Sequence, residues 1–256
     1  MKKALLLLGT LFLSSCSSYA TNCVAHRGNN AEYFENSMSA IISAVEVGSD
    51  GVEFDILHTL DGIPIVFHDK KLKRLAKHRP YRYCHLDAKV HDLTFKEIRQ
   101  NCILKNGEDI PTLEEVLIYL NSQNIIKVLE FKDLPNHISF RLIESHIDDP
   151  SLLRIISFKY KALERFEFMG NRNPYFKDIP LLFLYPMFVK LKDKYGFNIR
   201  FTERGLKKLS KFKGQRATGV WTVDDPNDMK LVIEKDIDYL TTNNPKMCLE
   251  LKRRYQ

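Results

Sequence analysis

The sequence predicts a single α/β domain built as a (β/α)₈ barrel, with an insertion after the second strand. Short β-branched or apolar runs alternate along the chain with segments of helical period, which is typical of βαβ units around a parallel sheet. About 240 residues follow the N-terminal leader, and no internal repeat, low-complexity tract or linker divides them. A doubly wound sheet would show a similar alternation, so that architecture is the alternative.

Eight segments have the composition of strands, at residues 23–25, 51–57, 125–131, 153–158, 181–185, 196–201, 218–223 and 238–241. Helical patterns lie between them, at residues 37–46, 94–99, 113–120, 138–147, 161–168, 203–211 and 228–235. Ser37 and Thr112 have the side chains of N-caps, and Pro111 supports the second boundary.

The stretch at residues 63–111 is longer than a standard crossover and is predicted to be an insertion near the second strand. Within it, residues 69–82 contain seven lysines and arginines. A run of like charges is usually a solvated surface, and this interpretation is favoured here over the binding of anionic headgroups.

The N-terminus has the form of an export signal. Two lysines precede the apolar run at residues 4–13, which is too short to span a bilayer. Leu13 lies three positions before Cys16 with small residues between, which resembles a bacterial lipobox. We therefore expect a signal peptide at 1–15, a lipidated Cys16 in a short tether at 16–22, and the barrel domain at 23–256. The alternative is an ordinary signal peptide cleaved after Ala20.

The expected location is the periplasmic side of a bacterial membrane, through a lipid anchor on Cys16, or a soluble exported form if Cys16 is not lipidated. Loss of residues 1–15 removes two lysines and lowers the formal charge from +7 to +5. This basic excess favours an anionic membrane surface or an anionic substrate. Nucleic acid is not an expected partner, because no zinc-ligand, RNP-like or helix-turn-helix signature accompanies the charge.

Four cysteines remain once Cys16 is assigned to lipid, an even number for an oxidising compartment. Cys84 and Cys102 would close a short loop and are the first choice for a disulfide. Cys23 begins a predicted buried strand and is expected to be a small hydrophobic residue. No CxxC or Cys/His metal spacing occurs, so zinc is not expected.

Acidic residues gather on two predicted strands. Because strand side chains alternate, Glu53 and Asp55 share one side while Phe54 points to the other. Glu130 and Lys132 repeat this spacing at the end of the next predicted strand. Two buried carboxylates on one inward face are costly unless a cation lies between them. Three carboxylates from two strands form a hard oxygen site suited to one divalent metal, Ca²⁺ or Mg²⁺.

Two histidines flank these acids in the sequence. His26 and Arg27 close the first strand, and His68 follows the apolar run at 63–67. Each signal is weak alone, but strand ends converge at the C-terminal face of a barrel, where they would form one constellation. The other histidines are expected at the surface or satisfied in the core: His58, His78, His85, His91, His137 and His146.

The sequence resembles the glycerophosphodiester phosphodiesterase family over nearly all of the mature chain. The matching motifs agree in order and spacing, and they are His26-Arg27-Gly28, Glu35-Asn36-Ser37, Glu53-Phe54-Asp55, Asp61-Gly62, His68-Asp69, Pro111-Thr112-Leu113-Glu114-Glu115, Glu130-Phe131-Lys132 and Trp221-Thr222-Val223. The resemblance implies a TIM-barrel enzyme that hydrolyses glycerophosphodiesters to glycerol 3-phosphate and an alcohol.

The resemblance also implies roles for single residues. His26 and His68 would be the general acid and base, although the sequence does not decide which is which. Arg27 and Lys132 would contact the phosphate, and Trp221 would line the alcohol pocket. The metal ligands would be Glu53, Asp55 and Glu130.

The chain departs from the family pattern at a few positions. Phe34 replaces the proline usual before Glu35, and Ser37 replaces threonine. Asp224 stands where asparagine commonly follows Trp-Thr-Val, and Asn243-Asn244-Pro245 replaces the usual ending with aspartate. These departures leave the shape of the alcohol pocket open.

Two other functional classes stay open. An exported metal-dependent phospholipase acting on intact lipids or lysolipids would suit the lipid anchor and the basic insertion. A non-catalytic lipoprotein could retain the barrel as a binding module. The presence of all seven polar site residues disfavours the binding module.

Overall fold

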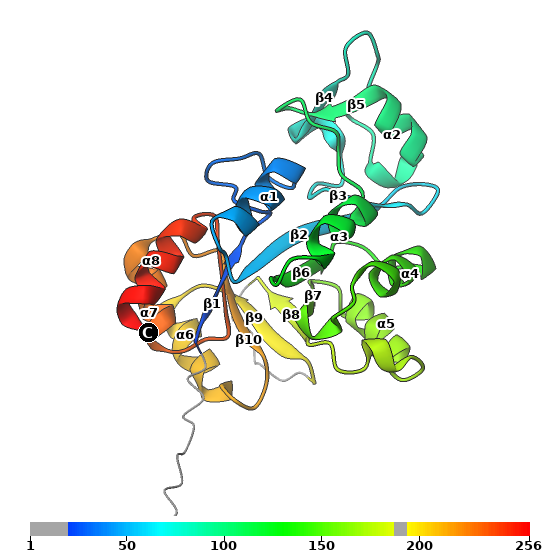
Figure 1. Cartoon of the computed structure of the whole chain (residues 1–256). Coiled ribbons are helices and arrows are strands. Elements are labelled where there is room, and N and C mark those ends of the chain that lie inside the picture. Colours follow the sequence, from blue (N-terminus) through cyan, green and yellow to red (C-terminus); the bar gives the residue numbers. More distant parts are fainter. Residues whose placement is uncertain (1–19, 187–193) are drawn as a thin grey trace, which may run out of the picture.

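The computed structural model describes residues 20–186 and 194–256, and it shows a closed barrel surrounded by helices (Figure 1). The predicted signal peptide, Cys16 and most of the predicted tether lie outside the described residues. No helix in the described part of the chain combines the length and the apolarity needed to cross a membrane.

Eight parallel strands form the barrel: β1 (Asn22–Ala25), β2 (Gly51–His58), β6 (Ile126–Phe131), β7 (Leu153–Ser157), β8 (Leu181–Tyr185), β9 (Gly196–Arg200), β10 (Thr218–Trp221) and β11 (Tyr239–Thr242). Each strand pairs with the next, and β1 pairs with both β11 and β2. This double pairing closes the ring, which excludes the open doubly wound sheet. The predicted strands and the barrel are confirmed, with boundaries that agree within two residues.

The outer helices are α1 (Met38–Glu46), α3 (Leu113–Asn121), α4 (His137–His146), α5 (Tyr160–Gly170), α6 (Glu203–Leu209), α7 (Pro226–Glu234) and α8 (Pro245–Tyr255). The predicted N-caps are confirmed: Ser37 accepts from the Ala40 backbone N–H, and Thr112 forms a capping box with Glu115. The helix α8 was not predicted. Only Pro245 and Cys248 of this helix are fully buried, and its last turn carries Lys252, Arg253 and Arg254, so its composition is mostly polar.

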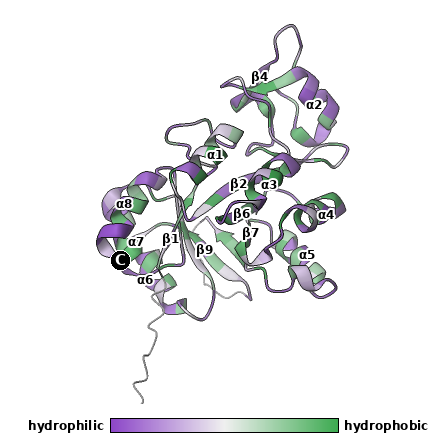
Figure 2. Ribbon diagram, viewed as in Figure 1, coloured by the Kyte–Doolittle hydropathy of each residue, from purple (hydrophilic) through white to green (hydrophobic). Residues whose placement is uncertain are grey.

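The strand side chains alternate between two cores. Val24, Val128 and Ile156 belong to a cluster inside the barrel, whereas Phe54 and Leu129 pack with the helices outside it. Figure 2 shows the corresponding mixture of hydrophilic and hydrophobic segments in the surrounding helices. Because the middle of the barrel is filled by this apolar cluster, polar side chains on the inward face lie toward the open end of the barrel.

The insertion lies between β2 and α3, as predicted, and projects from the barrel (Figure 1). It contains β3 (Pro64–Val66), β4 (Ala76–His78), α2 (Phe95–Asn101), β5 (Cys102–Leu104) and two three-residue 3₁₀ turns, Leu72–Arg74 and Val90–Asp92. β3 pairs antiparallel with β2, so the chain returns along β2 before it leaves the barrel. The insertion has its own apolar core, and the predicted Cys84–Cys102 disulfide is present within it.

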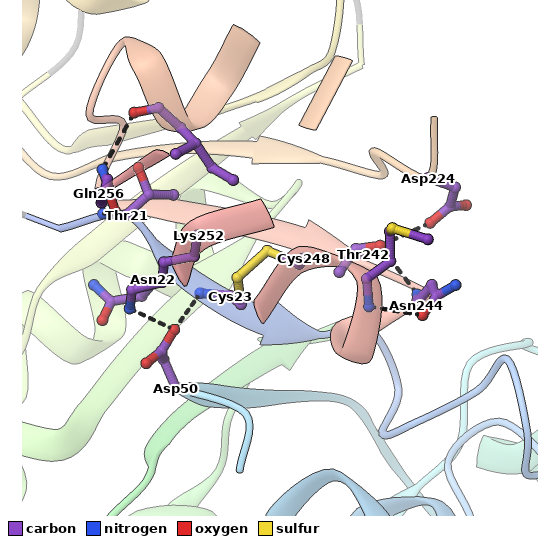
Figure 3. The surroundings of a disulfide bond; sticks show 12 residues. Thr21, Asn22, Cys23, Asp50, Asp224, Thr242, Asn244, Cys248, Lys252 and Gln256 are labelled. Carbon is purple, nitrogen blue, oxygen red and sulfur yellow. Dashed lines mark hydrogen bonds and ion pairs between the residues drawn. A yellow bond between two sulfur atoms is a disulfide. The ribbon is translucent and has the colours of Figure 1, made fainter. Parts of the chain in front are cut away.

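A second disulfide joins Cys23 to Cys248, so the prediction that Cys23 is only a small hydrophobic residue was wrong. The two cysteines are 225 residues apart in the sequence, and barrel closure brings β1 and α8 together. Figure 3 shows the bond beside Asp50, whose Oδ2 accepts hydrogen bonds from the Cys23 backbone and from Lys252 Nζ, both at 2.8 Å. The sequence gives no local signal for this contact.

Removal of the Cys23–Cys248 bond should destabilise the protein more than removal of Cys84–Cys102. Loop closure by the long bond restricts the unfolded chain by about 5 kcal/mol, against about 3 kcal/mol for the short one. Paired Cys→Ala variants compared by denaturant unfolding would measure the difference, with m-values checked for two-state behaviour. Equal loss of stability in the two variants would contradict this order.

Candidate active site

The predicted site residues meet in one cavity of about 160 Å³ at the C-terminal end of the barrel strands. Seven of the eight predicted catalytic, substrate and metal residues line it: His26, Arg27, Glu53, His68, Glu130, Lys132 and Trp221. Asp55, the eighth, is fully buried within the acidic group described below. The remaining predicted residue, Cys16, lies outside the described part of the chain.

Three carboxylates form a compact buried group. Glu53 and Asp55 come from β2, and Glu130 lies opposite Asp55 in the register of β6. One oxygen from each lies within 4.8 Å of the others. Glu53 Oε1 and Asp55 Oδ1 are buried and have no hydrogen-bond partner. Unpaired buried carboxylate oxygens facing one point are suited to a divalent cation.

Burial and mutual repulsion disturb the pKa values of this group. Burial, with the charges of Asp55 and Glu130, raises the pKa of Glu53 well above its usual value. Burial and Asp55 raise the pKa of Glu130 to about 7. Burial acts in the same direction on Asp55, but the Lys132 and Arg27 charges hold its pKa below the usual value. The protein cations thus compensate one carboxylate and leave the others poorly compensated.

Two cationic side chains flank the acids. Arg27 Nε lies 3.1 Å from Asp55 Oδ2, and Arg27 Nη1 donates to Glu35 Oε1 at 2.7 Å. Lys132 Nζ donates to Glu130 Oε1 at 2.6 Å and lies 3.4 Å from Asp55 Oδ1. Both cations line the cavity, so each can contact an anion bound there as well as the acids.

The backbone at Arg27 and Gly28 has an unusual conformation that the motif requires. Arg27 has φ 56° and Gly28 has φ 83°, both in the left-handed region. A Cβ on Gly28 would lie 2.5 Å from the Ala40 backbone carbon of α1, so only glycine fits. This turn also directs the Arg27 backbone N–H to Glu53 Oε2, at 2.9 Å.

Asn36 is a site residue to which the sequence analysis assigned no role. It also has a left-handed backbone, with φ 57°. Its amide donates to Asp55 Oδ2 at 2.8 Å, and its carbonyl accepts from the Asp55 backbone N–H at 3.1 Å. In the sequence, the motif Glu35-Asn36-Ser37 was the one feature that could have indicated this role. A buried asparagine that bonds both ends of a carboxylate-bearing residue fixes the direction of that carboxylate.

His26 is held by an amide. Its Nδ1 lies 2.7 Å from Asn243 Oδ1, which also accepts from Asn30 Nδ2 at 2.8 Å. Asn243 Nδ2 in turn donates to Asp224 Oδ2 at 2.7 Å. Two departures from the family pattern therefore form one hydrogen-bonded pair behind His26. Burial, with the Arg27 charge, lowers the pKa of His26 to about 4.

His68 is held by a carboxylate. Its Nδ1 lies 2.5 Å from Asp69 Oδ1, and Asp69 Oδ2 accepts from Arg74 Nε at 2.6 Å. Burial also lowers the pKa of His68, although the Asp55 and Asp69 charges oppose this. The two histidines thus enter the cavity with partners of different charge.

The other six histidines, all within the described residues, do not line this cavity, in agreement with the expectation that they lie at the surface or are hydrogen-bonded in the core. His58 is the buried example, because its two ring nitrogens lie 2.5 Å from Asp133 Oδ1 and 2.7 Å from Ser139 Oγ. A histidine satisfied on both sides has no nitrogen left for a ligand.

Aromatic residues form one wall of the cavity. Trp221 meets Phe158 edge to face, with ring centroids 5.4 Å apart, and Trp221 Nε1 donates to the Asn198 carbonyl at 3.3 Å. Lys132 Nζ lies 5.6 Å from the Phe158 ring centroid. The wall is therefore apolar next to the cations, which suits a small organic group attached to an anion.

Comparison with known proteins places the chain in a family. The profile of the glycerophosphoryl diester phosphodiesterase family matches residues 26–149. A glycerophosphodiester phosphodiesterase of Caldanaerobacter subterraneus subsp. tengcongensis is 29% identical, over 91% of this chain and 98% of the relative. Human glycerophosphodiester phosphodiesterase 1 is 32% identical, over 51% of this chain and 40% of the relative.

Solved structures share the fold over most of the chain. A glycerophosphodiester phosphodiesterase from Parabacteroides distasonis has a TM-score of 0.74 at 24% identity, covering 93% of this chain and 99% of that one. An Oleispira antarctica phosphodiesterase in complex with the product sn-glycerol-3-phosphate has a TM-score of 0.75 at 21% identity, covering 91% and 97%. With these matches to profile, sequence and fold, the chain belongs to the glycerophosphodiester phosphodiesterase family.

Proposed function

We propose that the protein hydrolyses glycerophosphodiesters to glycerol 3-phosphate and an alcohol, using one divalent cation, Ca²⁺ or Mg²⁺, and two histidines. One observation carries this proposal: a buried carboxylate group, two of whose oxygens have no hydrogen-bond partner, shares a cavity with two cationic and two imidazole side chains. The activities named for the relatives agree with it, as does the sn-glycerol-3-phosphate bound to the Oleispira antarctica phosphodiesterase.

The cation would be held by Glu53, Asp55 and Glu130, whose carboxylates suit a hard metal in number and type. When bound, it would offset negative charge on the non-bridging phosphate oxygens. Asn36 keeps Asp55 directed at the group. Arg27 and Lys132 would bind the phosphate from the cavity side, where a guanidinium offers paired donors and an ammonium a point charge.

The partners of the histidines favour different proton roles. Asn243 Oδ1 accepts two hydrogen bonds, so the His26 Nδ1 beside it carries the proton and Nε2 has a free lone pair. A neutral His26 with a lowered pKa is suited to take a proton from the attacking hydroxyl, of water or of the substrate glycerol. The Asp69 carboxylate beside Nδ1 opposes the lowering of the His68 pKa and would stabilise the imidazolium more than an amide does, so His68 is the better candidate to protonate the departing alkoxide.

The cavity volume favours a small diester over a lipid. About 160 Å³ is below the usual size of pockets that bury a drug-sized ligand, so an acyl chain would extend outside it. A coupled assay for choline release tests the proposal, with glycerophosphocholine against detergent-dispersed lysophosphatidylcholine, and with and without chelator. Glycerol 3-phosphate is measured as the second product of the first substrate. Faster turnover of lysolipid would favour the phospholipase, and no turnover of either would favour the binding module.

Glu53→Gln and Asp55→Asn should each abolish metal-dependent turnover and leave the barrel folded, because each removes a ligand charge without changing side-chain size. Titration calorimetry with Mg²⁺ or Ca²⁺ should show weakened binding in both. Glu114→Gln, on the outer helix α3, is the matched control. Unchanged activity of either site variant at saturating metal would refute the ligand assignment.

His26→Ala and His68→Ala should each lower kcat by about 10²- to 10⁴-fold, the usual contribution of a positioned acid or base. If His68 is the acid, a diester with a p-nitrophenol leaving group should rescue His68→Ala, because that leaving group needs no proton. The same substrate should restore little activity to His26→Ala. Equal rescue of both variants would show that the pair does not divide the proton transfers in this way.

We also propose that the protein is exported and anchored by lipid on Cys16, on the strength of the N-terminal sequence. Serine lacks the sulfur atom to which the lipid would be attached. Cys16→Ser should therefore move the protein from the membrane fraction to the soluble fraction, as followed by immunoblot. Continued tight membrane association of the variant would point to another anchor.

A further inference from the structure

A second depression, of about 230 Å³, adjoins the catalytic cavity. We call it the basic groove, and its lining includes four lysines, one aspartate and two histidines: Lys70, Lys89, Lys132, Lys159, Asp133, His58 and His91. Lys132 lines both the groove and the catalytic cavity, so the two hollows share that side chain. An anion that contacts Lys132 in the cavity is therefore next to the groove.

The groove carries positive charge that the described residues do not neutralise. Lys70, Lys89 and Lys159 form no ion pair or side-chain hydrogen bond within the described part of the chain. Asp133 is the one acid lining the groove, and both its oxygens bind His58, at the backbone N–H and at Nδ1. Uncompensated ammonium groups around a concavity repel one another unless an anion lies between them.

The three free lysines are carried by separate parts of the fold that are fixed relative to the site. Lys159 is the N-cap of α5, directly after β7. Lys70 follows His68 by two residues and accepts at its carbonyl from the Val90 N–H, at 2.8 Å. An isolated bridge pairs Lys71 with Lys89, which holds two segments of the insertion against each other. The insertion thus completes the groove rather than projecting away from the site.

We propose that the basic groove binds an anionic group, phosphate or carboxylate, on the alcohol portion of the glycerophosphodiester substrate. The inference rests on the proposed function and narrows its substrate class. With the scissile phosphate at Arg27 and Lys132, the alcohol that leaves toward His68 lies beside Lys70. A second anion on that alcohol would then meet Lys70, Lys89 and Lys159.

Two substrates that differ by one phosphate test this directly: glycerophosphoinositol and glycerophosphoinositol 4-phosphate, both followed by glycerol 3-phosphate release. The wild-type kcat/KM should be about tenfold higher for the phosphorylated diester, mainly through KM, as expected for an added charge contact. This preference should shrink as the salt concentration rises, because the groove lysines are exposed.

The Lys89→Glu/Lys159→Glu double variant should lower the ratio of the two kcat/KM values about tenfold or more, since it reverses two charges in the groove. Lys96→Glu/Lys161→Glu is the matched control. It makes the same charge change at exposed positions on α2 and α5 that do not line the groove. The control should keep the wild-type ratio, and circular dichroism would verify that both variants are folded.

Three results would overturn the inference. One is a wild-type ratio near one. Another is an equal fall of the ratio in the control, which would show a general effect of net charge. The third is loss of binding to phosphatidylglycerol vesicles in the groove variant with an unchanged ratio, which would assign the groove to a membrane surface. Failure of the proposed function would look different, because wild-type protein would release glycerol 3-phosphate from neither diester at any metal concentration.

Discussion

The site depends on keeping three carboxylates together in a buried position, where their charges repel. Glu53, Asp55 and Glu130 are tolerated there because Arg27 and Lys132 compensate part of the charge and a cation would compensate the rest. The conformation of the neighbouring backbone serves this compensation of charge. The left-handed turn at Arg27 brings both its guanidinium and its N–H to the acids, and Gly28 lets α1 approach closely enough to support that turn.

The insertion contributes to this balance of charge, although it lies outside the barrel. Arg74, from its first 3₁₀ turn, pairs with Glu35 at 2.8 Å and with Asp69 at 2.6 Å. Glu35 also binds Arg27, and Asp69 binds His68, so one arginine links the partners of a cationic side chain and an imidazole that both line the cavity. Exposed ion pairs add little stability singly, but here they fix orientation. The insertion is therefore part of the active site.

The fold and most of the site could be predicted because their signals are local. Alternating apolar runs identified the strands, and the two-residue spacing of Glu53 and Asp55 placed both on the inward face. The missed features depend on distant or weak signals. The Cys23–Cys248 bond exists because a closed barrel makes its first and last units neighbours, and α8 is rich in charged residues with few that are fully buried. Asn36 needed its left-handed backbone to be seen before its contact with Asp55 could be inferred.

The departures at Asp224 and Asn243 looked independent in the sequence, yet they are one exchange. The family pattern places asparagine after Trp-Thr-Val and aspartate in the later motif, and this chain has the two side chains in reversed positions. In this chain the pair carries one negative charge and a mutual hydrogen bond, with the amide facing His26 and the carboxylate behind it. An amide oxygen fixes the imidazole tautomer as a carboxylate would, with less stabilisation of the imidazolium. Asn243 therefore fixes the orientation of His26 without placing a carboxylate against it, whereas His68 contacts the carboxylate of Asp69 directly.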